Sequence, residues 1–218
     1  MTTGGEGGMV TTNDRDLWSA MWSFKDHGKS WEAVYGLQHP PGFRWFHESF
    51  GTNWRMLEIQ AAIGRIQLRR MKEWTARRNA NAQMLAGVCA KHSAIRVPIL
   101  RCDSASDTNC AANLGCCVHA QYKFYAYVNP DELADGWSRD RIIDEIVRAG
   151  VPCYHGSCSE VYLEKAFDGT GWRPAERLPV AHELGEISLM FLVHPTLTGQ
   201  EMEKACQVVD TVLGRASR

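Results

Sequence analysis

The sequence predicts an α/β protein, and three observations support this prediction. A helical pattern of apolar residues runs without proline from Met56 towards Leu85. Strand patterns alternate with helix patterns after it, as in small α/β domains. The 218 residues, 44% of them hydrophobic, can bury a full core in one large domain or in one domain and a part of another.

The first predicted elements follow a glycine-rich loop, residues 4–8. Glycines at this density let the backbone take positive φ and approach a bound group closely, although such loops are often only structural. We expect a short strand over residues 8–12. Residues 13–16 suit a turn and a helix N-cap, so a helix is expected to begin near Asp14, with Leu17, Met21 and Phe24 on one face.

A long connection over residues 27–50 mixes glycine, proline, histidine and aromatic residues. Connections of this length are usually functional or disordered, and the aromatic content argues against disorder. We expect His27 and Gly28 to be structural and to end the preceding helix, where histidine interacts favourably with the helix dipole.

A long helix is predicted over residues 56–90, because Met56, Ile59, Ile63 and Ile66 recur at helical spacing. A helix of this length can join two domains. It carries six basic residues scattered around its axis, which favours a solvated or intersubunit face. They are Arg65, Arg69, Arg70, Lys72, Arg77 and Arg78.

The remaining residues, 91–218, are expected to form a small α/β domain. Strands are predicted over residues 95–100, 121–128 and 189–193. Ser138 should cap a helix over residues 139–149 that Gly150 ends, and Thr198 should cap a final helix to about Leu213. His194 and the proline after it are expected to be structural.

A cysteine-rich insertion lies within this domain, at residues 102–119. It holds ligand types for zinc or an iron–sulfur cluster, namely Cys102, Cys110, Cys116, Cys117 and His119. Its spacing lacks a clean C-x2-C pair, so we favour a surface loop with reduced thiols and predict no metal. The eight cysteines come with no sign of export, and we expect most of them to be reduced.

Charge and hydropathy exclude several classes of partner. The net charge of −1 offers no electrostatic reason for binding nucleic acid or anionic membrane. The longest apolar run, residues 189–193, is too short to cross a bilayer, and the first residues lack the features of a signal peptide. We therefore expect a cytoplasmic protein.

Two motifs give the sequence a family resemblance. Gly5-Glu6-Gly7-Gly8 and, further on, Gly51-Thr52-Asn53-Trp54-Arg55-Met56 stand in the order seen in the DegT/StrS family of sugar-nucleotide aminotransferases, which use pyridoxal phosphate. The chain resembles the C-terminal portion of these enzymes, except in the insertion. The resemblance implies a type I, aspartate aminotransferase-like fold: the end of the large domain at 1–55, a bridging helix at 56–90 and the small domain at 91–218.

In that family a Ser-Phe-x-x-x-Lys segment, whose lysine forms the Schiff base with the cofactor, precedes the Gly-Glu-Gly-Gly loop. Here no lysine occurs before Lys25, so we assign no catalytic residue and expect the chain by itself to be inactive. Two alternatives stay open. The chain is a non-catalytic cysteine-rich binding or scaffold domain derived from such an enzyme, or Met1 is an internal methionine of a longer reading frame.

The resemblance also implies a chemistry and a set of site residues. Family members transfer an amino group, usually from glutamate, to a keto group of a nucleotide-linked sugar, for sugar or polysaccharide biosynthesis. Gly5, Glu6, Gly7, Asn53 and Arg55 become the cofactor-binding residues, with Asn53 reaching the cofactor phosphate across a homodimer interface.

The alternatives for two of these residues are structural: Asn53 caps the helix at Met56, or Arg55 forms an ion pair with Glu58. On the substrate side, the resemblance implies Tyr154 and His155. Their order departs from the family's His-Tyr-x-Pro pattern, so a plain loop histidine is an equal reading of His155.

Overall fold

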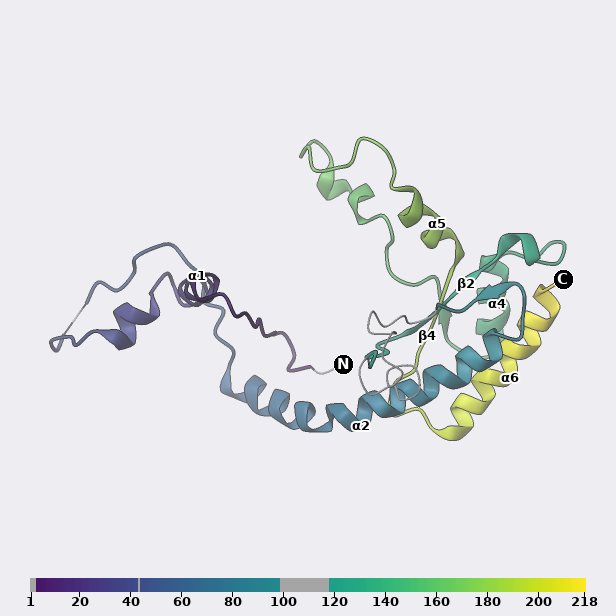
Figure 1. The fold of residues 1–218 in the computed structure, drawn as a ribbon, viewed down its shortest axis with the longest axis horizontal. Helices are drawn as coiled ribbons and strands as arrows, with labels where there is room; N and C mark the ends of the chain where they lie inside the picture. Colours follow the sequence, from purple (N-terminus) through teal and green to yellow (C-terminus); the bar gives the residue numbers. More distant parts are fainter. Residues whose placement is uncertain (1–2, 43, 99–117) are drawn as a thin grey trace, which may run out of the picture. The chain divides into compact units, whose positions relative to one another are not determined.

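The computed structural model describes residues 3–42, 44–98 and 118–218. The chain divides into two compact units, Met1–Met71 and Lys72–Arg218, and each is described here by itself (Figure 1). The division falls inside the long helix α2, Glu58–Cys89, which begins in the first unit and ends in the second.

The first unit contains helix α1, Arg15–Lys25, as predicted. The Asp14 side chain caps it by accepting hydrogen bonds from the backbone amides of Asp16 and Leu17, at 2.9 and 3.0 Å. The predicted strand over residues 8–12 is wrong: these described residues form coil, because no neighbouring strand pairs with them. The long connection contains a π-helix, η1, over Glu32–Gly36.

The end of α1 is fixed by close backbone packing. His27 takes a positive φ of 61°, and the Gly28 amide donates to the Ser23 carbonyl at 2.8 Å. A Cβ atom on Gly28 would lie 1.7 Å from the Ser49 carbonyl oxygen, so only glycine fits there. The predicted structural role of this pair therefore agrees with the geometry.

Helix α2 confirms the predicted long helix and begins two residues later than expected. Its 32 residues include a buried set only in the second half, where the helix belongs to the second unit: Arg78, Asn81, Ala82, Leu85 and Cys89. The prediction of a solvated basic face is wrong for Arg78, because its guanidinium is buried inside the second unit. It donates to the Tyr122 carbonyl at 3.1 Å, and burial lowers its pKa.

The second unit is built on a four-stranded antiparallel sheet in the order β1-β2-β4-β3. The strands are β1 Ile95–Arg96, β2 Phe124–Val128, β3 Cys153–Tyr154 and β4 Ser188–Phe191. Phe124 pairs with Phe191, and Tyr127 pairs with Ser188. The sequence missed β3, since two residues carry no periodic pattern.

Two of the helices in this unit have the predicted caps. Ser138 caps α4, Arg139–Arg148, and Thr198 begins α6, Gly199–Ala216, with a complete capping box. The remaining helical elements were not predicted. They are η2 Pro130–Glu132, η3 Val161–Leu163, η4 Lys165–Phe167 and α5 Pro179–Ile187.

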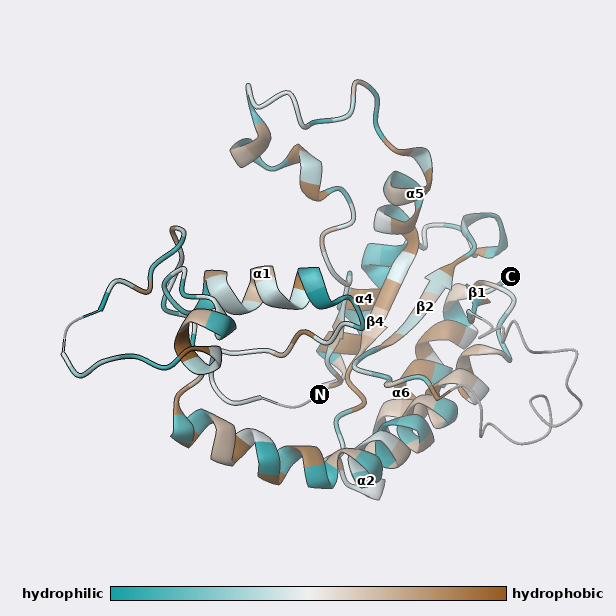
Figure 2. Cartoon of the chain, turned by 60° about the vertical axis from the view of Figure 1, so that its left-hand side comes forward, coloured by the Kyte–Doolittle hydropathy of each residue, from teal (hydrophilic) through white to brown (hydrophobic). Residues whose placement is uncertain are grey.

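One core holds the second unit together. Buried side chains from α2, β2, α4, β4 and α6 form a single cluster, which includes Leu85, Ala126, Ile146, Leu189 and Leu213. Figure 2 shows the apolar β4 beside β2 at the centre of this unit. Among the helices of the described residues, none has both the length and the apolar composition needed to span a bilayer.

Candidate functional site

The glycine-rich loop lies against the start of α2. The Gln60 side chain donates to the Glu6 carbonyl at 2.6 Å, and a Cβ atom on Gly4 would lie 3.2 Å from the Gln60 carbonyl oxygen. Gly5 and Gly7 have φ values of 84° and 151°, which other residues rarely adopt. The loop thus needs its glycines for both its conformation and its close approach to the helix.

Gln60 also completes the beginning of the helix. Its side-chain oxygen accepts a hydrogen bond from the Leu57 amide at 3.0 Å, one turn before it. Asn53 lies five residues before the first helical residue, Glu58, so the capping alternative for Asn53 is wrong. One side chain, Gln60, therefore connects the loop to the helix end.

Asn53 and Arg55 lie beside the end of α1. Asn53 forms an isolated antiparallel bridge with Asp26, and the Trp54 amide donates to the Lys25 carbonyl at 3.0 Å. Arg55 Nε lies 3.4 Å from Asp26 Oδ1 and 3.5 Å from Asn53 Oδ1. The ion pair that the structure gives Arg55 is with Asp26 and not with Glu58, the partner in the structural alternative, because the bridge brings Asp26 to Arg55.

The loop, α1 and residues 54–56 enclose a pocket of about 870 Å³ within the first unit. Two of the predicted cofactor residues, Gly7 and Arg55, line it directly. Gly5, Glu6 and Asn53 belong to the same two segments as these residues. The structure thus brings both motifs, almost fifty residues apart in the sequence, to one pocket.

Sequence reasoning missed the other side of this pocket, which α1 provides through Trp18, Trp22, Phe24 and Lys25. The Lys25 ammonium lies 3.5 Å from the centre of the Trp22 ring, a cation–π contact. The apolar spacing that places Met21 and Phe24 on one face of α1 is the signal for this side of the pocket, but spacing alone does not show that the face lines a pocket.

The donors around the pocket suit a phosphate group. Glycines with positive φ expose backbone amides, and the Arg55 guanidinium, about half exposed, can donate two parallel hydrogen bonds to an anion. The residues present therefore fit the phosphate end of pyridoxal phosphate. Lys25 is the lysine among the lining residues, and it stands outside the motif that supplies the family's Schiff-base lysine.

The predicted substrate residues lie in the second unit. Tyr154 ends β3 and is half exposed, and His155 follows it with its Nε2 atom 3.2 Å from Asp140 Oδ1. Arg139, 2.5 Å away, is the main cause of the lowered pKa of Asp140, and His155 lowers it further. The Ser188 hydroxyl donates to the His155 carbonyl at 2.7 Å, which fixes the backbone at this point.

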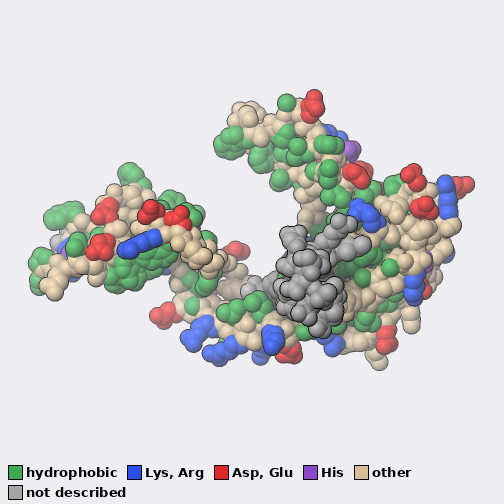
Figure 3. Space-filling view, viewed as in Figure 1, with side chains coloured by type: hydrophobic (Ala, Val, Ile, Leu, Met, Phe, Trp, Pro, Cys, Tyr) green, Lys and Arg blue, Asp and Glu red, His purple; other side chains and the backbone are tan. Residues whose placement is uncertain are grey.

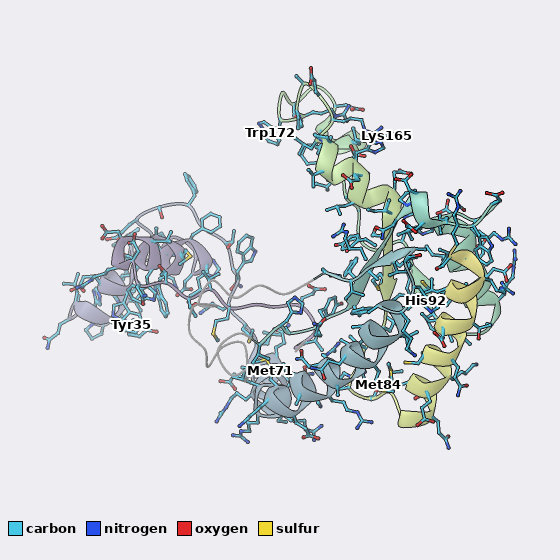
Figure 4. All side chains as sticks on the ribbon, turned by 45° about the vertical axis from the view of Figure 1, so that its right-hand side comes forward. Tyr35, Met71, Met84, His92, Lys165 and Trp172 are labelled. Atoms are coloured by element: carbon cyan, nitrogen blue, oxygen red, sulfur yellow. The ribbon has the colours of Figure 1, made fainter. Side chains whose placement is uncertain are left out.

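A polar cluster that the sequence did not reveal holds the segment between β3 and β4. The Glu160 carboxylate accepts hydrogen bonds from the Tyr162 hydroxyl at 2.6 Å and from Arg177 Nε at 2.8 Å, with His182 Nδ1 at 3.3 Å. Arg177, followed by Tyr162, lowers the pKa of Glu160 to about 2. In Figure 4, Lys165 and Trp172 mark the outer part of this segment.

The thiols show no metal-binding arrangement in the part of the chain that the structure describes. Cys89, Cys153, Cys158 and Cys206 are free, and burial raises the pKa of Cys89 and of Cys153 to about 12. The described residues contain no cluster of histidine, cysteine and carboxylate ligands for a metal. His119 accepts from the Gln121 amide at 3.0 Å. The candidates Cys102, Cys110, Cys116 and Cys117 lie outside the described residues.

The fold corresponds to a class of enzyme, since solved structures with this backbone are aminotransferases of the type I fold. The chain belongs to the DegT/DnrJ/EryC1/StrS aminotransferase family, whose sequence profile matches residues 1–212. Aminotransferases of this family use pyridoxal phosphate. The predicted family, fold class and family cofactor are thus confirmed.

Three relatives show how much of such an enzyme the chain represents. An aminotransferase from Psychrobacter cryohalolentis is 58% identical, with a TM-score of 0.87 over 98% of this chain and 53% of its own. The dTDP-3-amino-3,4,6-trideoxy-alpha-D-glucose transaminase of Streptomyces venezuelae is 28% identical over 98% of this chain and 47% of its own. GDP-perosamine synthase from Caulobacter vibrioides is 42% identical over 35% of this chain and 18% of its own. The chain spans about half of these relatives' length or less.

Proposed function

We propose that this chain serves in the pyridoxal-phosphate-dependent transfer of an amino group from an amino acid, glutamate by family analogy, to a keto group of a nucleotide-linked sugar. The observation that carries the proposal is the pocket where the glycine loop meets Arg55. The names of the relatives, a perosamine synthase and an aminosugar transaminase, support a sugar nucleotide as substrate. We further propose a cytoplasmic homodimer.

The chain's own residues are assigned to binding and orientation in this proposal. The loop amides at Gly5 to Gly7 and the Arg55 guanidinium hold the cofactor phosphate, and Asn53 donates to it across the dimer interface. When bound, the cofactor supplies the electron sink for the transfer. Tyr154 and His155 are assigned to the sugar nucleotide, with Asp140 orienting the His155 ring.

The phosphate assignment is tested by comparing pyridoxal phosphate with pyridoxal, which lacks the phosphate. We expect the chain to bind the phosphorylated form more tightly, as measured by quenching of tryptophan fluorescence. Arg55→Ala should reduce this difference by about tenfold, because a charged hydrogen-bond donor is lost. Arg69→Ala, on the exposed part of α2, is the matched control. An unchanged difference in the Arg55 variant would assign Arg55 a structural role through Asp26.

We also propose that the 218 residues alone do not attach the cofactor covalently. The support is the absence of a lysine before Lys25 in the sequence, and the contact of Lys25 with the Trp22 ring. Borohydride reduction in the presence of pyridoxal phosphate, followed by peptide mass spectrometry, should label no lysine stoichiometrically. Stoichiometric label on Lys25, lost in Lys25→Ala, would contradict the proposal.

A further inference from the structure

Arg139, the first residue of α4, is a mostly buried cation in the second unit. Its side chain is 13% exposed, so little of it is open to a ligand. Its Nη1 atom donates to the Gly185 carbonyl at 2.8 Å and to the Ser188 carbonyl at 3.4 Å. Gly185 lies in the last turn of α5 and Ser188 begins β4. One guanidinium therefore joins three elements, which its planar fork of N–H groups allows.

A further contact of Arg139 leads to the His155 side chain. Arg139 Nε donates to Asp140 Oδ1 at 2.5 Å, and the same oxygen lies 3.2 Å from His155 Nε2. Because Arg139 lowers the pKa of Asp140, this carboxyl group is ionised and can only accept hydrogen bonds. The ring proton of His155 therefore lies on Nε2. Nδ1, to which the described residues make no hydrogen bond, is left for a ligand.

Arg139 also supports the backbone of His155. The Ser188 carbonyl accepts from Arg139, and the Ser188 hydroxyl donates to the His155 carbonyl at 2.7 Å. Ser188 is buried and pairs with Tyr127 in the sheet, so this support is anchored in the interior of the unit. Two separate links, one through Asp140 and one through Ser188, thus run from Arg139 to the same histidine.

The link through Asp140 depends on Arg139 because both of its other groups are exposed. The Asp140 side chain is 69% exposed and that of His155 61% exposed, and water weakens a pair this exposed. Figure 3 shows acidic, basic and histidine side chains gathered on the surface around α5, the helix that Arg139 holds. On a surface of mixed charge, a mostly buried cation beside Asp140 fixes the position of its carboxylate.

We propose that Arg139 is a positioning residue of the sugar-nucleotide site, which fixes the ring and the backbone of His155 and does not itself contact the substrate. The positioned ring lines a pocket of about 390 Å³ together with Gly185. The described lining residues include Ser157, Ser159 and Glu160 but no lysine or arginine, so the pocket suits sugar hydroxyls better than phosphates. This inference rests on the proposed function, where His155 is assigned to the sugar nucleotide.

The first test needs no ligand. In the 218-residue chain labelled with ¹³C-histidine, nuclear magnetic relaxation measures the order of the His155 ring. Arg139→Gln should lower this order, because Asp140 is no longer held. Arg141→Gln, on the same helix, removes a hydrogen bond to the Gly136 carbonyl and should leave the His155 ring unchanged. An unchanged ring in the Arg139 variant would overturn the inference.

A second variant covers a loss of folding in Arg139→Gln, which circular dichroism detects. Arg139→Lys keeps the charge and the aliphatic stem and should give the same loss of ring order. One ammonium group cannot replace the planar fork that contacts Asp140 and two carbonyl groups. Full order of the His155 ring in Arg139→Lys would equally contradict the proposal.

The second test is a double-mutant cycle on sugar-nucleotide binding, measured by calorimetry. The probes are dTDP-glucose and GDP-mannose, which have no keto group and so bind without reacting. Arg139→Gln should weaken binding of the better probe about tenfold, but less than about twofold when His155 is already alanine. Equal losses in both backgrounds would give Arg139 a purely structural role and overturn the inference.

Failure of the proposed function has a different signature. If neither probe binds, or if His155→Ala leaves binding unchanged, the substrate assignment of His155 is wrong, and with it the role of Arg139 in that site. The ring measurement would still show whether Arg139 holds His155. If His155→Ala weakens binding and the cycle is additive, the substrate assignment stands and only the inference about Arg139 fails.

Discussion

The two units of this chain differ in what holds them together. The second unit encloses a core from three helices and a sheet, with Ile146, Leu189 and Leu213 fully buried. In the first unit, among the described residues, only Ala33 is a buried apolar side chain, and the conformation depends on helix caps, a backbone bridge and glycines packed against carbonyl groups. The first unit therefore owes its described contacts to backbone and polar groups, and the second unit to apolar packing.

The largest expected difference is in the free energy of unfolding, between variants of two isoleucines. Ile146→Ala in the core of the second unit should lower the free energy of unfolding by about 2–5 kcal/mol, because it leaves a cavity. Ile63→Ala on the exposed part of α2 should change it by less than about 0.5 kcal/mol. Urea unfolding followed by circular dichroism measures both. A large loss at Ile63 would show that the first unit has a core after all.

Two glycines with similar positive φ allow the effect of steric crowding to be distinguished from the effect of backbone strain. Gly28→Ala places a Cβ atom on the Ser49 carbonyl and should disrupt the loop after α1, whereas Gly171→Ala meets open space and should add only about 1–2 kcal/mol of backbone strain. Amide exchange at residues 26–29 and 47–53 reports the first effect. If both variants leave exchange there unchanged, the backbone packing does not specify the first unit.

Two helix caps, one in each unit, provide a closer comparison. Thr198→Ala removes the capping box of α6 and should lower the global stability by about 0.5–2 kcal/mol. Asp14→Ala removes the cap of α1 and should instead increase local amide exchange in α1, because that helix is not part of a core. Equal shifts of the urea midpoint in both variants would contradict this distinction.

The smallest expected effect is a pH dependence of the local stability of the segment between β3 and β4. Because Arg177 and Tyr162 lower the pKa of Glu160 to about 2, its ion pair stabilises the segment between β3 and β4 at any pH above the ordinary value of 4.5. This stabilisation should be lost as the pH falls from 4.5 to about 2. Amide exchange over residues 160–178 should rise in that window, and Glu160→Gln should remove the dependence. A rise centred outside that window would contradict the assignment to Glu160.

Sequence patterns predicted the elements that depend on local signals. The period of α2, a helix cap within residues 13–16, the caps at Ser138 and Thr198, and the buried strand at Leu189 could all be predicted from neighbouring residues. The strand expected at residues 8–12 failed, because a strand needs a partner that local sequence does not reveal. Helix α5 and strand β3 were missed, since one lies in an irregular segment and the other has two residues.

The candidate site was predictable in part for the same reason. The motifs around Gly7 and Arg55 could be recognised as residue patterns, and the structure places both at one pocket. The partners of these residues could not be recognised: Asp26 for Arg55, and Gln60 for the Glu6 carbonyl, lie far from them in the sequence. Such pairs form because folding brings distant segments of the chain together. No local sequence pattern specifies which segments meet.

By itself, then, the sequence determined the family, the family cofactor and the main helices. Motifs and helical periodicity are patterns of residues that lie close together in the sequence, so they can be recognised without the structure. Only the tertiary structure decided which unit has a core, which acid meets Arg55 and which rings of α1 stay exposed. Burial and ion pairing depend on contacts between distant segments, and these exist only once the chain has folded.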